Sequence, residues 1–110
     1  MSMNREEALQ ALGECRTKID DVDLRLLALL NERTRIVERI GRIKRELAWP
    51  IYEPKREDEV FRNVTEHNSG PLPPDAVKRV FERIIDEMRN VQKLRMVEKE
   101  PDQEKKQEED

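Results

Sequence analysis

The sequence is poor in glycine, aromatic residues and cysteine. Among its 110 residues are three glycines, two phenylalanines, one tyrosine, one tryptophan and one cysteine. Sandwiches and barrels need many turns and flat apolar surfaces, so this composition argues against both. The single cysteine, Cys15, excludes an internal disulfide, and the longest apolar run, Leu26 to Leu30, is far too short to cross a membrane. With 43% charged and 35% hydrophobic residues, we expect a soluble, all-α, cytoplasmic protein.

Charge is distributed unevenly along the chain. Residues 98–110 hold seven acids, three bases and no apolar residue, which gives a net charge of −4 against −3 for the whole chain. Such a segment cannot bury enough surface to offset its ordering entropy, so we expect a disordered acidic tail after a single domain of residues 1–97. That domain has a net charge of +1, and its cations alternate with acids, which argues against nucleic-acid binding.

A repeating apolar pattern predicts one long helix over about residues 5–47. Seam positions three and four residues apart hold Leu12, Cys15, Ile19, Val22, Leu26, Leu29, Arg33, Ile36, Ile40, Ile43 and Leu47. Such a helix is roughly 60 Å long, and the residues that follow are too few to cover it. The sequence therefore predicts a homodimer in which two long helices share a core.

Prolines divide the rest of the chain into two further helices. Pro50 disfavours helical geometry in the residue before it and so ends the first helix. Pro54 suits the first position of a second helix, which we expect to end near His67. A loop rich in glycine and proline follows over residues 68–74, and a third helix is predicted from Pro74 to about Val97.

Arg33 occupies a seam position where an aliphatic residue is expected. A guanidinium there is unfavourable without an anionic partner, and it cannot lose its proton. The partner is either a carboxylate such as Asp23 of a neighbouring helix, in a purely structural role, or a ligand. Lys44 projects from the same face about 16 Å along the axis, and in an antiparallel dimer Arg16 of the partner subunit reaches the same region. Three cations around one cleft suit a small dicarboxylate.

Three other polar residues, Glu53, Glu57 and Gln92, have either a structural role or a role in binding a ligand. Glu53 and Glu57 are either site residues or simply acids favoured by the dipole at the start of the second helix. Gln92 lies on the buried stripe of the third helix, where an amide is either satisfied in the core or directed at a ligand.

Together these residues resemble the all-helical, AroQ-class chorismate mutases over roughly residues 9–95. The resemblance is carried by Arg16-Thr-Lys-Ile-Asp-Asp-Val-Asp23, Leu26 to Arg33, Ile40-Gly-Arg-Ile-Lys44, Pro50 to Glu57, Ile84-Ile85 and Gln92. It implies an intertwined homodimer of three-helix chains with shared active sites. The implied reaction is the intramolecular Claisen rearrangement of chorismate to prephenate in phenylalanine and tyrosine biosynthesis, which needs no metal or cofactor.

Carried over position by position, the resemblance implies a role for each candidate residue. Arg33, Arg56 and Arg16 of the partner subunit would bind the two substrate carboxylates. Lys44 and Gln92 would face the ether oxygen, so that Lys44, Gln92 and Arg33 are the catalytic candidates. Glu53 and Glu57 would lie near the ring hydroxyl, with Glu57 also beside Lys44, while Ile40, Ile85 and Met88 would line the pocket. Met88 stands where some members have a serine, and Glu53 where an aspartate is common.

Three other functions remain open at this point. An isochorismate pyruvate-lyase shares the fold and several of the cations. A regulatory module of the same fold would bind chorismate or prephenate for a partner enzyme of the aromatic pathway without turning it over. A coiled-coil interaction protein would tolerate leucine at Arg33.

Overall fold

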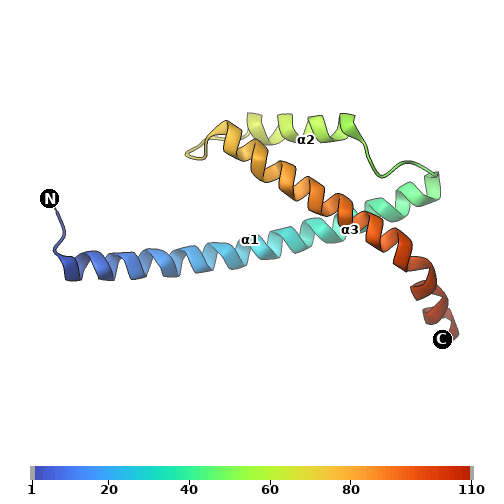
Figure 1. Ribbon diagram of the computed structural model, residues 1–110, viewed down its shortest axis with the longest axis horizontal. Helices are drawn as coiled ribbons and strands as arrows, with labels where there is room; N and C mark the ends of the chain where they lie inside the picture. The colour runs from blue at the N-terminus through green and yellow to red at the C-terminus, as the bar shows by residue number, and fades with distance from the viewer. Residues whose placement is uncertain (1, 110) are drawn as a thin grey trace. The chain divides into compact units, whose positions relative to one another are not determined.

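Three helices make up the protein, in a computed structural model that describes the backbone of residues 2–109 and the side chains of residues 2–94. They are α1 (Arg5–Leu47), α2 (Pro54–Glu66) and α3 (Pro74–Glu109), and the described backbone contains no strand (Figure 1). The predicted all-α class with one very long helix is confirmed. The bounds of α1 are those predicted, α2 ends one residue earlier, and α3 continues past the predicted residue 97. The predicted acidic tail, 98–110, lies outside the described side chains and stays a prediction, as does the domain of residues 1–97.

The end of α1 turns the chain back on itself. Ala48 adopts a left-handed backbone conformation with φ of 55°, and the amide of Trp49 donates to the carbonyl of Lys44 at 2.8 Å. This pattern closes a helix by satisfying carbonyls of its last turn. Pro54 then starts α2, as predicted, because its missing N–H needs no helical partner at the first position.

The chain divides into two compact units, of which the first ends at Arg33 and the second begins at Thr34. In the first unit, none of the described residues 2–33 is buried. The predicted seam is widely exposed there, with Ile19 at 58%, Leu26 at 51% and Leu29 at 60%. A single chain therefore leaves this apolar face to solvent. None of the described helices is both long enough and apolar enough to span a membrane.

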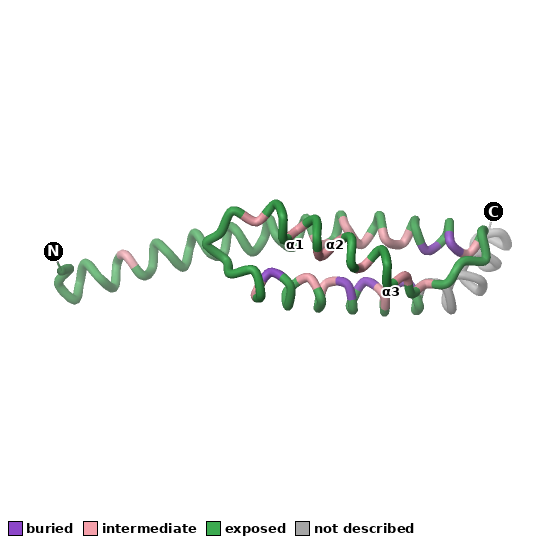
Figure 2. Tube along the Cα trace, turned by 90° about the horizontal axis from the view of Figure 1, so that it is seen from above, coloured by how far each residue is buried: buried purple, intermediate pink, exposed green. Residues whose placement is uncertain are grey.

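The second unit holds the packed part of the protein. α2 packs against α3, and side chains of α3 contact the last four turns of α1. Figure 2 places the buried positions along α3 and near the end of α1, and the buried apolar residues are Val77, Ile85 and Met88. Val80, three residues after the buried Val77 on α3, is 49% exposed. The core is thus small and lies where α3 faces the other two helices.

Candidate functional site

A buried lysine is the centre of the candidate site. Lys44, in the last turn of α1, is only 7% exposed. Its Nζ donates to the carbonyl oxygen of Ile51 at 2.8 Å and pairs with Glu53 Oε1 at 2.9 Å. Both acceptors come from the connection between α1 and α2, which the left-handed residue Ala48 turns back toward the helix. A buried ammonium is favourable only when it is paired and hydrogen-bonded in this way.

A buried amide lies against the same face of α1. Gln92 of α3 is 7% exposed, and its Nε2 donates to the carbonyl oxygen of Val37 at 3.1 Å. A Cβ added at Gly41 would lie 3.6 Å from Gln92 Cγ, so the glutamine stem runs close over this glycine. Val37, Gly41 and Lys44 are four and three residues apart and share one face of the helix. The amide of Gln92 therefore packs against the face of α1 that carries Lys44.

Apolar residues of α3 accompany Gln92. Ile85 and Met88 lie seven and four residues before it on the same face, and both are buried. The hydroxyl of Thr34 on α1 lies 3.4 Å from Met88 Sδ. Ile40, the third residue predicted to line the pocket, is 40% exposed in the single chain.

The two glutamates have different partners in the structure, and their predicted place near the ring hydroxyl of a substrate stays a prediction. Glu53, not Glu57, pairs with Lys44. The carboxylate of Glu57 hydrogen-bonds instead to the guanidinium of Arg89 on α3, a residue that sequence reasoning missed. Arg56 projects outward and pairs with Glu59 at 3.2 Å, with 66% of its side chain exposed.

Arg16 and Arg33 belong to the first unit, where Arg16 is exposed and Arg33 is half-buried. Both are on α1, 17 residues apart, which corresponds to about 25 Å along a helix. One small ligand cannot contact both of these residues of the same chain.

Arg89 has three partners in the second unit. Besides Glu57, its guanidinium lies 3.4 Å from Asp86 and 5.0 Å from the ring centre of Tyr52. The hydrogen bond with Glu57 raises the pKa of Arg89 above its usual value, against the opposite effect of burial. Its sequence signal was its position four residues after Ile85 and three before Gln92, which puts it beside the buried stripe.

The second unit thus offers two buried N–H donors held by hydrogen bonds, the ammonium of Lys44 and the amide of Gln92. Among the described side chains, no three His, Cys, Asp or Glu residues come together in a way that could hold a metal ion. The arrangement can stabilise negative charge on a small molecule by preformed donors in a place of restricted water.

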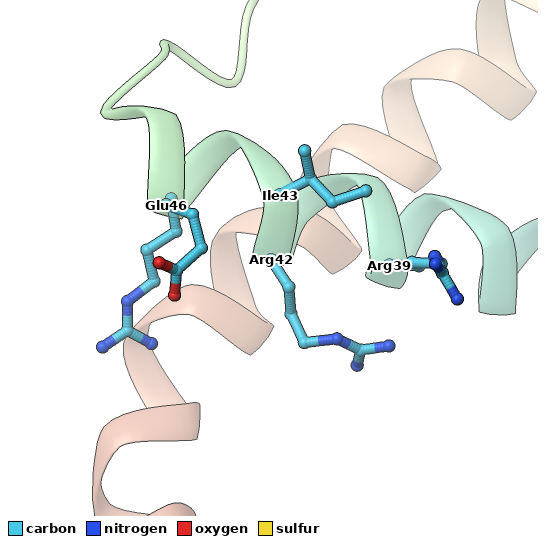
Figure 3. Close-up of a pocket in the computed structure, with 5 residues that line it drawn as sticks. Arg39, Arg42, Ile43 and Glu46 are labelled. Carbon is cyan, nitrogen blue, oxygen red and sulfur yellow. The ribbon is translucent and has the colours of Figure 1, made fainter.

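A separate hollow lies along α1 between Arg39 and Glu46. It has a volume of about 360 Å³ and is lined by Arg39, Arg42, Ile43, Arg45 and Glu46 (Figure 3). None of the residues predicted for the site lines it. Figure 3 shows the side chains of Arg39 and Arg42 extending from neighbouring turns of the same helix.

Comparison with known proteins identifies relatives over most of the chain. The family described as chorismate mutase type II matches residues 15–93. A bifunctional chorismate mutase/prephenate dehydratase of Aquifex aeolicus is 37% identical over 81 residues, which are 70% of this chain and 22% of that protein. The chain spans about a fifth of the length of the bifunctional relatives it matches.

Solved structures resemble the chain over nearly their whole length. A chorismate mutase (form II) of Thermus thermophilus is 37% identical with a TM-score of 0.71, covering 78% of this chain and 94% of that one. A chorismate mutase of Helicobacter pylori in complex with prephenate is 29% identical with a TM-score of 0.76, covering 81% of this chain and 97% of that one.

Proposed function

The chain belongs to the chorismate mutase type II family, and on that premise we propose that it catalyses the rearrangement of chorismate to prephenate. The observation that carries the proposal is the buried pair of N–H donors formed by Lys44 of α1 and Gln92 of α3, which packs on the same face of α1. The relative solved with prephenate supports the choice of substrate and product. The same reaction belongs to phenylalanine and tyrosine biosynthesis.

The rearrangement requires hydrogen-bond donors and a positioned substrate rather than a reactive side chain. In the rearrangement one C–O bond breaks while one C–C bond forms within the same molecule, and electron density builds on the ether oxygen. An ammonium has three N–H donors, of which Lys44 directs one to Ile51 and one to Glu53, leaving the third for this oxygen. The Gln92 amide has two N–H donors and uses one on Val37, so its second can serve the same atom. Both donors are already held in place, which is how preformed dipoles lower a barrier.

Binding of the two carboxylates selects the compact conformer of the substrate. We assign this role to Arg33 and Arg56 together with Arg16 of the partner subunit, because guanidinium groups bind carboxylates in forked pairs. Arg56 is largely exposed and holds only an exposed ion pair with Glu59, which a substrate carboxylate can replace. Glu53 and Glu57 are assigned to the ring hydroxyl end, and Ile40, Ile85 and Met88 to the apolar wall.

The active sites are proposed to be shared within a homodimer. The apolar face of α1 in residues 5–33 is exposed in one chain, and a second copy of the same face is its natural cover. Since one ligand cannot contact Arg16 and Arg33 of the same α1, Arg16 acts in the site of the partner subunit.

The test is a direct assay of the purified chain. Loss of chorismate absorbance, with formation of prephenate identified by mass spectrometry, is the expected result. Isochorismate is assayed in parallel, and release of pyruvate from it would assign the chain to the lyase reaction instead. Binding of chorismate without turnover would overturn the catalytic proposal and favour a regulatory module. Light scattering of the same sample should give the mass of two chains.

The bifunctional relatives bear on the fate of the product. The bifunctional relatives join the matched region to a prephenate dehydratase. This supports the prediction that prephenate made by this chain passes to a partner enzyme of aromatic amino acid synthesis.

A further inference from the structure

Arg89 connects α3 to the first turn of α2 and to the connection before α2, which also holds the two acceptors of Lys44. Its guanidinium binds Glu57 in the first turn of α2 and lies 5.0 Å from the ring centre of Tyr52, which is in the connection before α2. The side chain is 24% exposed and that of Glu57 is 23% exposed, so the pair is screened from water. An arginine in this position can bind a carboxylate with its edge and an aromatic ring with its face at the same time.

Tyr52 stands between the two residues that hold the lysine. The carbonyl of Ile51 and the carboxylate of Glu53 are the two acceptors of Lys44 Nζ, at 2.8 and 2.9 Å. Because the three residues are consecutive, the backbone at Tyr52 restrains the Ile51 carbonyl directly and the Glu53 carboxylate through the backbone that carries its side chain. A contact that immobilises Tyr52 therefore also immobilises the surroundings of the lysine.

We propose that Arg89 is a positioning residue of the site. By holding Tyr52 and Glu57, it fixes the connection between α1 and α2 over Lys44 and keeps the ammonium directed at the reacting oxygen. The inference rests on the proposed function, since it assigns Arg89 a part in that reaction. Arg89 does not itself touch the substrate, and its effect passes through Tyr52 to the acceptors of Lys44.

The kinetic test compares Arg89→Met and Arg89→Lys with a matched control. Arg83→Met is the control, because Arg83 is also on α3 and forms an ion pair, with Glu87 at 2.8 Å, but 78% of its side chain is exposed. Misplacing a catalytic group by an ångström can reduce a rate a hundredfold, so we expect kcat of Arg89→Met to fall about tenfold or more, with KM changing about threefold or less. Arg89→Lys keeps the charge but not the planar fork, and should recover part of the loss.

Two kinetic results would overturn the inference. An unchanged kcat for the folded Arg89→Met variant, combined with a lower unfolding midpoint, would reduce Arg89 to a purely structural role. A large rise in KM at constant kcat would make Arg89 a substrate ligand instead of a positioning residue.

A spectroscopic test does not depend on activity. Tyr52 is the only tyrosine, so incorporating 3-fluorotyrosine gives one 19F resonance that reports the surroundings of its ring. We expect this resonance to move in Arg89→Met and to stay in place in Arg83→Met. If it stays in place in both variants, the inference is wrong whatever the kinetics. The two failures are distinguishable. If the unmodified chain does not convert chorismate, the proposed function is wrong. A resonance that still responds to Arg89→Met would show that the contact with Tyr52 exists all the same.

Discussion

Replacing Lys44 by methionine removes the charge at the centre of the site and keeps most of the side-chain volume. Lys44 is 7% exposed, so its hydrocarbon stem is packed and a methionine of similar length can fill the same space. The substitution takes one partner away from the Ile51 carbonyl and from Glu53. Losing a partner costs about 1–3 kcal/mol for a buried polar group. Because Ile51 is half-buried and 36% of the Glu53 side chain is exposed, water can reach both, and we expect a loss of about 1 kcal/mol in the free energy of unfolding.

The effect on the rate should be much larger than the effect on stability. Removing one preformed donor to a developing oxyanion lowers kcat by about 10² to 10³, or roughly 2.7–4 kcal/mol. The donor on Lys44 is both charged and buried, which favours the upper end, so we expect kcat to fall about 10³-fold.

The assay follows chorismate absorbance at saturating substrate, with urea unfolding by circular dichroism on the same samples. Lys93→Met serves as the matched control, since Lys93 is an exposed lysine next to Gln92. It should retain the activity and stability of the unmodified chain. A Lys44→Met variant that is folded and retains kcat within about threefold would refute the role given to the ammonium.

Three further predictions concern other residues of the two units. Gly41→Ala should raise the free energy of unfolding by about 0.5–1 kcal/mol, because alanine favours the helix more than glycine does. The new Cβ fits, since it would meet Gln92 Cγ at an ordinary contact distance of 3.6 Å, and a destabilised variant in urea titration would contradict this packing. Arg33→Leu should lower kcat/KM by about 10² or more while the dimer persists in light scattering, whereas unchanged turnover would favour a coiled-coil protein without a ligand. Gln92→Glu should make kcat fall about tenfold per pH unit above the pKa of the new carboxyl, because only the protonated acid donates; a pH profile as flat as that expected with glutamine would exclude donation from this position.

The helices could be predicted because each boundary has a local cause. Proline at positions 50, 54 and 74 sets one end of each helix, and the apolar spacing from Leu12 to Leu47 requires a continuous α1. The exposure of Ile19 and Leu29 in the single chain agrees with the reasoning that the residues after α1 are too few to cover it. Spacing alone does not fix burial on α3, since Val80 lies three residues after the buried Val77 and is 49% exposed.

Pairing between elements could not be predicted from the sequence. Periodicity places Arg89 next to the buried stripe of α3, but its partners Glu57 and Tyr52 lie more than 30 residues away in the chain. The choice of Glu53 rather than Glu57 as the carboxylate on Lys44 depends on how the chain turns at Ala48. That left-handed turn has no signal in the sequence, because alanine rarely adopts it.

The central claim, that each active site contains residues of two chains, is tested most directly by mixing two inactive variants. Arg16→Ala and Lys44→Met chains are co-expressed, and the mixed dimers carry both defects in one site and neither in the other. Random pairing makes half of the dimers mixed, so the preparation should regain about one quarter of the activity of the unmodified chain. Activity no greater than the mean of the two separate variants would contradict the claim, because it would mean that Arg16 does not act in the site of the partner subunit.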